Sequence, residues 1–199
     1  METPRKPIAR NLRRWRLTRG LTISALAERA GVAKSTVSLI ERGRANPSID
    51  TIWALASELN VPFASLFHDE PTDAELTVVR DDDGAIVAID RAGKGQGGLI
   101  VRHMLTRSGG GAIEIYTLML QEGAIRRSDG HFAGLFEHIV VAQGTVEIRT
   151  DVFAETLHPG DLISFRADRP HSYKALEGHV RLVSVHEYPR HRDAPAPTG

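Results

Sequence analysis

Residues 130–144, GHFAGLFEHIVVAQG, bring together side chains that can bind a metal ion or a small molecule. His131 and the adjacent pair Glu137 and His138 offer imidazole nitrogens and carboxylate oxygens, which suit divalent ions such as Zn, Fe, Mn or Ni. An apolar run follows and ends at Gly144. By itself the segment is compatible with a metal site, a ligand pocket or the remnant of one, so its role depends on the elements around it.

The chain has 199 residues, enough for one or two domains with a substantial core. It contains no cysteine, which excludes disulfides and thiolate metal sites and fits a reducing compartment. No apolar run approaches the roughly 18 residues that a membrane span needs. The first residues lack the apolar core of a signal peptide. These features predict a cytoplasmic protein with no membrane partner.

The net charge of zero hides an asymmetry along the chain. Residues 1–67 carry 11 Lys and Arg residues against 5 acidic ones, which leaves 14 basic and 20 acidic residues in the remainder. A basic first third joined to an acidic remainder predicts one part that meets a polyanion and another that does not.

Apolar spacing in residues 8–67 is typical of helices. The i, i+3, i+4, i+7 pattern of a single helical face is clearest at Ile52, Leu55, Ala56 and Leu59. Breaks at glycine or proline divide this region into about five short helices, with Ser48 as one N-cap. Residues 1–67 are therefore predicted to form an all-α domain.

From residue 76 onward, short apolar segments alternate with glycine-rich or charged turns, which is typical of a β-sandwich or barrel. The predicted strands are LTVVR, GAIVAID, LIVRHML, AIEIYTLML, FEHIVVAQG, TVEIRT, LISFRA and HVRLVSVHEY. Residues 68–75 are predicted to be a linker, residues 76–190 an all-β domain, and residues 191–199 a disordered tail. The fold class is thus α+β, with two domains.

The segment TISALAERAGVAKSTVSLIERG has the spacing of two short helices joined at Gly31. Ala27 is small where the helices cross, Gly31 suits the positive φ of the turn, and Val37 and Ile40 supply buried contacts. Together with the ERG-x-x-NPS motif that follows, the stretch from Leu12 to Val61 resembles the Cro/lambda-repressor-like, or XRE, helix-turn-helix family. The resemblance implies a five-helix domain that binds double-stranded DNA.

By this resemblance the recognition helix spans about residues 34–42 and presents its first turn to the major groove. The candidate contacts to base edges or phosphates are Lys34, Ser35, Thr36 and Ser38. The candidate phosphate contacts are Thr22, Arg42, Arg44 and Asn46. Ala33 stands where the family often has a capping Ser or Thr, which predicts a weaker N-cap. Because one such domain makes few base contacts, a homodimer on a two-fold operator is expected.

The β-rich part resembles the cupins, which are small double-stranded β-helix barrels. The first cupin motif maps onto Gly123, His131, Glu137 and Gly144, but Ala133 stands where the family has its second histidine. The second motif maps onto Pro159, Gly160, Asp161 and His171. Of the usual three histidines and one carboxylate, the resemblance leaves His131, Glu137 and His171.

Three interpretations of His131, Glu137 and His171 stay open. They are ligands of a divalent metal with open positions, polar groups that hold a small-molecule effector without metal, or satisfied residues at the barrel mouth. No cofactor follows with certainty. Strand alternation places His138 outside the barrel if Glu137 points inward, whereas the opposite register would bring His138 inside. Four further histidines are predicted to be surface or packing residues, with His186 also a candidate for the pocket wall; they are His103, His158, His179 and His186.

A helix-turn-helix followed by a cupin resembles a bacterial regulator architecture. The resemblance implies a sequence-specific transcription factor, not an enzyme, whose barrel senses a small-molecule effector and shifts the relative placement of two DNA-binding heads. The alternative is a metal-dependent cupin enzyme, such as a dioxygenase or isomerase, that carries a DNA-binding head. Ala133 argues against that alternative, because redox chemistry at a cupin metal needs a complete ligand set. An antitoxin-like regulator is disfavoured by the cupin.

Overall fold

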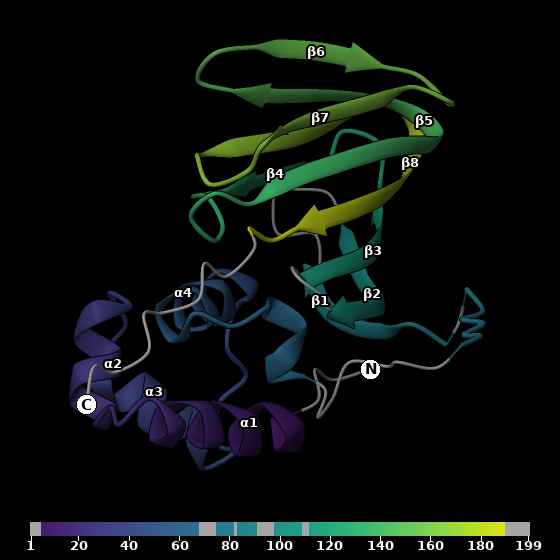
Figure 1. The fold of residues 1–199 in the computed structure, drawn as a ribbon. Helices are drawn as coiled ribbons and strands as arrows, with labels where there is room; N and C mark the ends of the chain where they lie inside the picture. Colours follow the sequence, from purple (N-terminus) through teal and green to yellow (C-terminus); the bar gives the residue numbers. More distant parts are fainter. Residues whose placement is uncertain (1–4, 68–74, 82, 91–97, 109–111, 190–199) are drawn as a thin grey trace, which may run out of the picture.

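A computed structural model describes residues 5–67, 75–81, 83–90, 98–108 and 112–189 of the chain. Its helices form a head that lies against one end of a β-barrel (Figure 1). No helix in these ranges is long and apolar enough to cross a membrane. The predicted tail and all but the last residue of the predicted linker lie outside the described residues.

The described part of the head contains four α-helices and one 3-10 helix. They are α1 (Arg5–Thr18), α2 (Ile23–Arg29), α3 (Lys34–Glu41), α4 (Ile49–Leu59) and η1 (Phe63–Leu66). The prediction of five helices is therefore corrected to four α-helices, because the fifth segment is only four residues long. It closes through a bond from the Ser65 N–H to the Pro62 carbonyl three residues back (3.0 Å), and it is too short for an α-helical ladder.

Local signals in the sequence fix most of the helix ends. The side chains of Thr22 and Ser48 accept bonds from the N–H groups of Ala25 and Thr51, so both residues are N-caps, as predicted for Ser48. Ala33 makes no side-chain cap at the start of α3, which confirms the weaker cap expected there. In the turn before it, Gly31 has φ +64°, a conformation that favours glycine.

A buried ion pair fixes α3 against α1. The Arg16 guanidinium donates to both carboxylate oxygens of Glu41, at 2.6 and 2.9 Å, and its third contact is the Leu21 carbonyl at 2.8 Å. Both side chains are less than one-tenth exposed. The hydrogen bond to Glu41 raises the pKa of Arg16, so the guanidinium stays charged. The acidic residue that opens the ERG motif thus positions α3 against α1.

The barrel consists of eight strands within the described residues. They are β1 (Ala85–Asp90), β2 (Leu99–Ser108), β3 (Ala112–Leu120), β4 (Ile125–Ser128), β5 (Phe136–Thr150), β6 (Ala154–Leu157), β7 (Leu162–Arg166) and β8 (His171–Glu187). All pairings are antiparallel, in the order β1-β2-β3-β8-β5-β6, with β4 added to β8 and β7 to β5. This is the two-layered barrel expected of a cupin.

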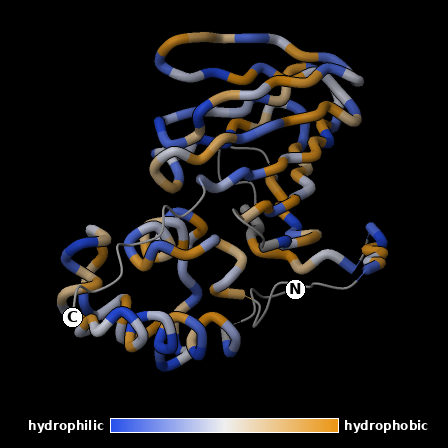
Figure 2. The backbone as a smooth tube through the Cα atoms, viewed as in Figure 1, coloured by the Kyte–Doolittle hydropathy of each residue, from blue (hydrophilic) through white to orange (hydrophobic). Residues whose placement is uncertain are grey.

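The long strands β5 and β8 each contribute to both layers. They bend at irregular pairings between Val141 and Val146, beside Gly144. Gly144 has φ +76°, and a Cβ there would lie 2.6 Å from the His179 carbonyl oxygen, so only glycine fits. Hydrophilic and hydrophobic residues alternate along the strands (Figure 2), and the apolar set fills the interior.

Four strand predictions need correction. HVRLVSVHEY, predicted as a separate strand, is only the second part of β8, which begins at His171. LTVVR at residues 76–80 forms no strand, and the side chains of Leu76 and Val78 are largely exposed, because no strand within the described part of the chain pairs with them. FEHIVVAQG and TVEIRT are two halves of the single strand β5. The short strands β4 and β6 were not predicted, since four residues of mixed polarity carry little periodic signal.

Candidate functional site

The predicted DNA contacts lie on the exposed side of the helix-turn-helix. Lys34 and Ser35 are exposed in the first turn of α3, and Thr36 and Ser38 are partly exposed. The opposite face of α3 buries Val37 and Ile40 in the head core, so the polar face is left to solvent. Helix α3 lies farther from the barrel than α4 does (Figure 1), which leaves it accessible to DNA.

The remaining predicted DNA contacts flank α3. Arg42, Arg44 and Asn46 are exposed in the segment that follows the helix. Thr22 is exposed at the start of α2, and its hydroxyl accepts a bond from the Ala25 N–H at 3.0 Å. That hydroxyl can still donate to a phosphate oxygen, so capping and DNA contact are compatible.

The second candidate site is a pocket at the end of the barrel that faces the head. Its empty volume is about 430 Å³, including the part open to solvent. The barrel contributes polar and apolar walls, and the head contributes Ile49, Trp53 and Phe63. The barrel residues are Leu99, Val101, Tyr116, Leu118, Arg126, Ser128, His131, Glu137, Tyr173 and His186. Two domains therefore build a single pocket.

Glu137 is the buried anion of this pocket. Its carboxylate accepts bonds from the Tyr173 hydroxyl and the Ser184 hydroxyl, both at 2.6 Å. The Nε2 atom of His186 lies 3.3 Å from one carboxylate oxygen, and the Nε2 atom of His171 lies 3.7 Å from the other. Burial alone raises the pKa of Glu137, but His186, then His171 and His131, outweigh it and hold this pKa well below its usual range.

The histidines around Glu137 present nitrogen atoms that lack hydrogen-bond partners. A carbonyl only accepts, so the Nδ1–H group of His171 donates to the Arg169 carbonyl at 2.8 Å, and Nε2 lies on the Glu137 side of the ring. Among the described residues, neither His171 Nε2 nor the Nδ1 atoms of His131 and His186 has a hydrogen-bond partner, although all three atoms are buried. Burial, followed by the nearby His186, holds the pKa of His131 well below its ordinary value, so this imidazole is neutral.

These donors fit a divalent metal. One ligating atom each from His131, Glu137 and His186 lies within 4.8 Å of the others, and neutral imidazoles with a carboxylate are the donors that mid-row divalent ions prefer. His171, which the sequence grouped with His131 and Glu137, borders the other carboxylate oxygen. Ala133 is exposed outside the pocket, and His186 supplies the additional imidazole from β8.

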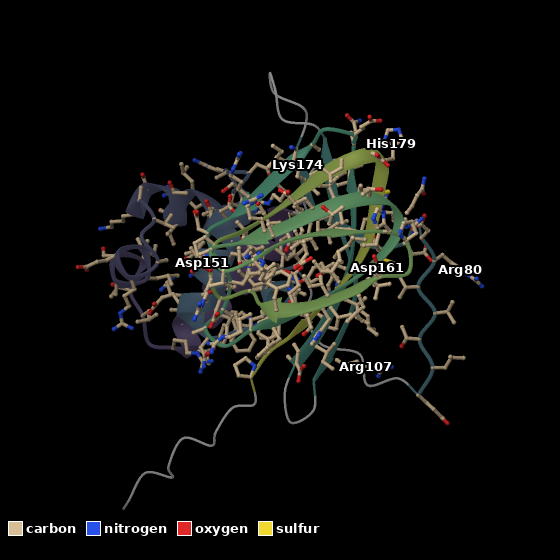
Figure 3. The ribbon with its side chains drawn as sticks, turned by 90° about the horizontal axis from the view of Figure 1, so that it is seen from above. Arg80, Arg107, Asp151, Asp161, Lys174 and His179 are labelled. Carbon is tan, nitrogen blue, oxygen red and sulfur yellow. The ribbon has the colours of Figure 1, made fainter. Side chains whose placement is uncertain are left out.

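The other predicted histidine positions divide between surface and interior. His138 lies on the outer face of β5, with Nε2 at 3.2 Å from a Glu187 carboxylate oxygen, so the register with Glu137 inside is confirmed. His158 is exposed, and His179 lies at the outer edge of the barrel (Figure 3). His103 is buried, and its Nε2 lies 2.8 Å from the Thr106 hydroxyl. Surface or packing roles therefore describe these four, while His186 belongs to the pocket.

The head closes the pocket through α4, which the sequence did not predict. The Trp53 ring stacks on His131 with centroids 4.0 Å apart, and its other neighbour is Phe63 at 4.4 Å. One helical turn earlier, Asp50 pairs with Arg126 of β4 at 2.5 Å. A signal for this contact exists in the sequence, because Ile49 and Trp53 form an apolar i, i+4 pair beside the core-facing stripe.

A second contact joins η1 to the barrel. The fully buried Glu114 carboxylate accepts bonds from the Ala64 N–H at 2.6 Å, the Tyr116 hydroxyl at 2.7 Å and the Tyr188 hydroxyl at 2.6 Å. The Tyr188 hydroxyl in turn accepts a bond from the Phe63 N–H at 3.0 Å. The first two N–H groups of η1, which no helical carbonyl can satisfy, are therefore capped by the barrel.

Comparison with known proteins agrees with this architecture. The helix-turn-helix family model matches residues 12–66. The chain is similar to the HTH-type transcriptional regulator SutR of Escherichia coli K12, with 31% identity over 191 residues that cover 96% of this chain and 99% of the relative. It is also similar to the HTH-type transcriptional regulator SinR of Bacillus subtilis, with 37% identity over 73 residues that cover 35% of this chain and 66% of the relative.

A solved structure shares both the head and the barrel. The crystal structure of an HTH_3 family transcriptional regulator from Vibrio cholerae superposes with a TM-score of 0.73 at 27% identity, and the match covers 94% of this chain and 97% of that one. The similarity thus extends over nearly the whole length in sequence and in fold. The chain belongs to the family of HTH-type transcriptional regulators that join an XRE-type helix-turn-helix head to a cupin domain.

Proposed function

We propose that this transcriptional regulator binds a two-fold DNA operator as a homodimer in the bacterial cytoplasm and that its barrel senses a small-molecule effector. The observation that carries the sensing proposal is the shared pocket, in which Trp53 of the DNA-binding head stacks directly on His131 of the barrel. A ligand that enters this pocket meets both domains at once. It can therefore favour one placement of the head over another, which is the requirement for allosteric control.

Recognition of the operator is assigned to the exposed first turn of α3. The groups that can contact base edges are the ammonium of Lys34 and the hydroxyls of Ser35 and Thr36. The groups that can pair with phosphates are the guanidinium groups of Arg42 and Arg44. Footprinting on DNA upstream of the protein's own gene tests this function. A protected two-fold site is expected, and the absence of any protected site would refute the proposal.

Substitution of Thr36 and Arg44 is expected to separate base recognition from phosphate binding. Thr36→Ala should weaken binding to the operator about tenfold and leave non-specific binding unchanged, because a base contact carries sequence information. Arg44→Ala should weaken both kinds of binding and reduce the slope of log affinity against log salt by about 1. Fluorescence anisotropy at several salt concentrations measures both effects.

The matched control is Arg149→Ala, which removes an exposed arginine from the barrel strand β5 and should leave both affinities unchanged. If Thr36→Ala preserved the preference for operator over random DNA, the assignment of base contacts to this turn of α3 would be wrong.

The pocket also fits a divalent metal as part of the sensing site. His131, Glu137 and His186 would hold the ion, with His171 beside them, and a bound ion would offer open coordination positions to an effector. Glu137→Ala is expected to remove tightly bound metal, because the carboxylate is the only anionic donor of the group. Elemental analysis of the purified chain after Zn, Fe, Mn or Ni supplementation measures the stoichiometry.

His138→Ala is the control for this measurement, since His138 neighbours Glu137 in sequence but lies outside the barrel. The metal site would be supported if the wild-type and His138→Ala chains contain stoichiometric metal and the Glu137→Ala chain contains none. Equal metal content in Glu137→Ala and the wild type would exclude this group as its site.

A further inference from the structure

We propose that the effector is a small oxyanion, such as a carboxylate, that binds Arg126 in place of the Asp50 carboxylate and thereby shifts α4 of the DNA-binding head relative to the barrel. This inference rests on the sensing function proposed above. It adds the chemical class of the ligand and the contact through which the ligand acts.

Arg126 is the anion-binding group that the pocket offers. It is the only Arg or Lys among the described residues that line the pocket, and its side chain is 15% exposed. A guanidinium presents five N–H donors in a planar fork that matches a carboxylate or a similar oxyanion with two parallel bonds. Its contact with Asp50 uses one nitrogen, Nη2, so the fork is incompletely used.

Asp50 is a partner that a ligand can replace. Its side chain is 49% exposed, and ion pairs that are open to solvent contribute little net stability. A ligand carboxylate inside the pocket would form the same ion pair with Arg126, in a position less exposed to solvent than that of Asp50. Replacing Asp50 by the ligand therefore costs the barrel little free energy, while the head loses its ion pair with Arg126.

The remainder of the pocket orients such a ligand. Glu137 already accepts two hydroxyl donors and faces two histidines, so it repels a second anion and leaves Arg126 as the place for one. Leu99, Val101 and Leu118 line the pocket as apolar wall. The matching ligand is a small molecule with an oxyanion at one end and a short apolar body.

The same helix transmits the exchange to the DNA-binding surface. Asp50 and Trp53 lie three residues apart on α4, so both side chains point to the barrel. A ligand in the pocket would lie beside both contacts. Helix α4 packs against α2, and α2 packs against the recognition helix α3. Loss of the Asp50 contact would therefore change how α4 lies against the barrel, while η1 stays bound to the barrel through Glu114 and Tyr188.

The test uses Trp53 as its own reporter. The chain has two tryptophans, Trp15 and Trp53, so Trp15→Phe leaves the pocket ring as the single source of tryptophan emission. The full-length Trp15→Phe chain is titrated with acetate, oxalate, sulfate and inorganic phosphate, against sodium chloride at equal ionic strength. Comparing the four titrations shows whether the site binds a carboxylate, sulfate or phosphate.

The proposal expects a saturable change in Trp53 emission with at least one of these anions and none with chloride. Asp50→Asn in the same background should lower the half-saturating concentration about tenfold, because it removes the competing carboxylate. Arg126→Gln should remove the response. Circular dichroism at 222 nm shows that each variant is folded, and Arg126→Lys, which keeps charge but loses the fork, should respond more weakly than the parent.

Two outcomes would overturn the proposal. The first is a response of Arg126→Gln equal to that of the parent. The second is the absence of any saturable response in Asp50→Asn, in which Arg126 has lost its carboxylate partner. No DNA is present in this experiment, so its failure leaves the footprinting result untouched, and a failure to find an operator leaves the anion site untouched.

Discussion

Trp53→Ala is expected to lower the free energy of unfolding by about 4 kcal/mol, the cost of removing a buried tryptophan. The side chain is 6% exposed and stacks on both Phe63 and His131, so its loss leaves a cavity that spans head and barrel. Because the cavity lies between two domains, we also expect the head to unfold at a lower urea concentration than the barrel. Urea titration followed by circular dichroism measures the change.

Trp53→Phe is the matched control for this substitution. A phenyl ring keeps the stack on His131 and most of the apolar contact, so the loss should be less than half that of Trp53→Ala. If Trp53→Ala changed the free energy of unfolding by less than about 1 kcal/mol, Trp53 would not be buried between the domains in solution.

Glu114→Leu is expected to lower the free energy of unfolding by about 3 kcal/mol. The carboxylate accepts three buried donors, among them the Ala64 N–H at the start of η1, and leucine would leave all three without their acceptor. The local consequence is measurable by amide hydrogen exchange. Protection of the Ala64 amide should fall about a hundredfold, the factor that corresponds to roughly 3 kcal/mol when tenfold is 1.4 kcal/mol.

The effect of Glu114→Leu should depend on pH in a defined direction. Burial, which outweighs the bonds from Tyr188 and Tyr116, raises the pKa of Glu114 above its ordinary 4.5. The folded chain therefore holds this proton more tightly than the unfolded chain. The associated stability is fully present below pH 4.5 and is lost as the pH rises through the folded pKa. The difference in the free energy of unfolding between wild type and Glu114→Leu should accordingly be largest at acidic pH.

Glu114→Gln separates hydrogen bonding from charge. Glutamine keeps a carbonyl acceptor for the Ala64 N–H but cannot ionise, so most of the Ala64 protection should survive and the pH dependence should vanish. A stability difference between wild type and Glu114→Leu that grew with rising pH would contradict the assigned direction of the pKa shift.

The structure of the head was easier to predict than that of the barrel, because the sequence signals for helix ends and turns are local. Thr22 and Ser48 cap helices through atoms three residues away, and Gly31 takes the left-handed turn that its own backbone permits. Helix α3, whose bounds the family resemblance implied as about 34–42, begins at Lys34 and ends at Glu41. The helix count failed only at η1, where four residues after Pro62 are too few to form an α-helix.

The barrel was predictable as a class but not strand by strand. Apolar runs such as those of β3 and the second part of β8 showed their alternation, whereas the continuation of β5 past Gly144 was not predicted. LTVVR has the same alternation but forms no strand, because pairing depends on a neighbour that sequence does not supply. The four-residue strands β4 and β6 form only because β8 and β5 offer them an edge.

By itself the sequence predicted an all-α head and an all-β remainder from the spacing of apolar residues, and its resemblance to known families implied a helix-turn-helix and a cupin. That resemblance grouped His131, Glu137 and His171; the structure places His131 and Glu137 in the pocket wall, whereas His171 lies 3.7 Å from the Glu137 carboxylate and is not among the residues that line the pocket. Only the tertiary structure decided that His186 adds a further imidazole, that Ala133 lies outside the pocket, and that Trp53 closes it. These contacts join residues between about 50 and 130 positions apart, and such distant neighbours are set by how sheet and helices pack rather than by any local pattern.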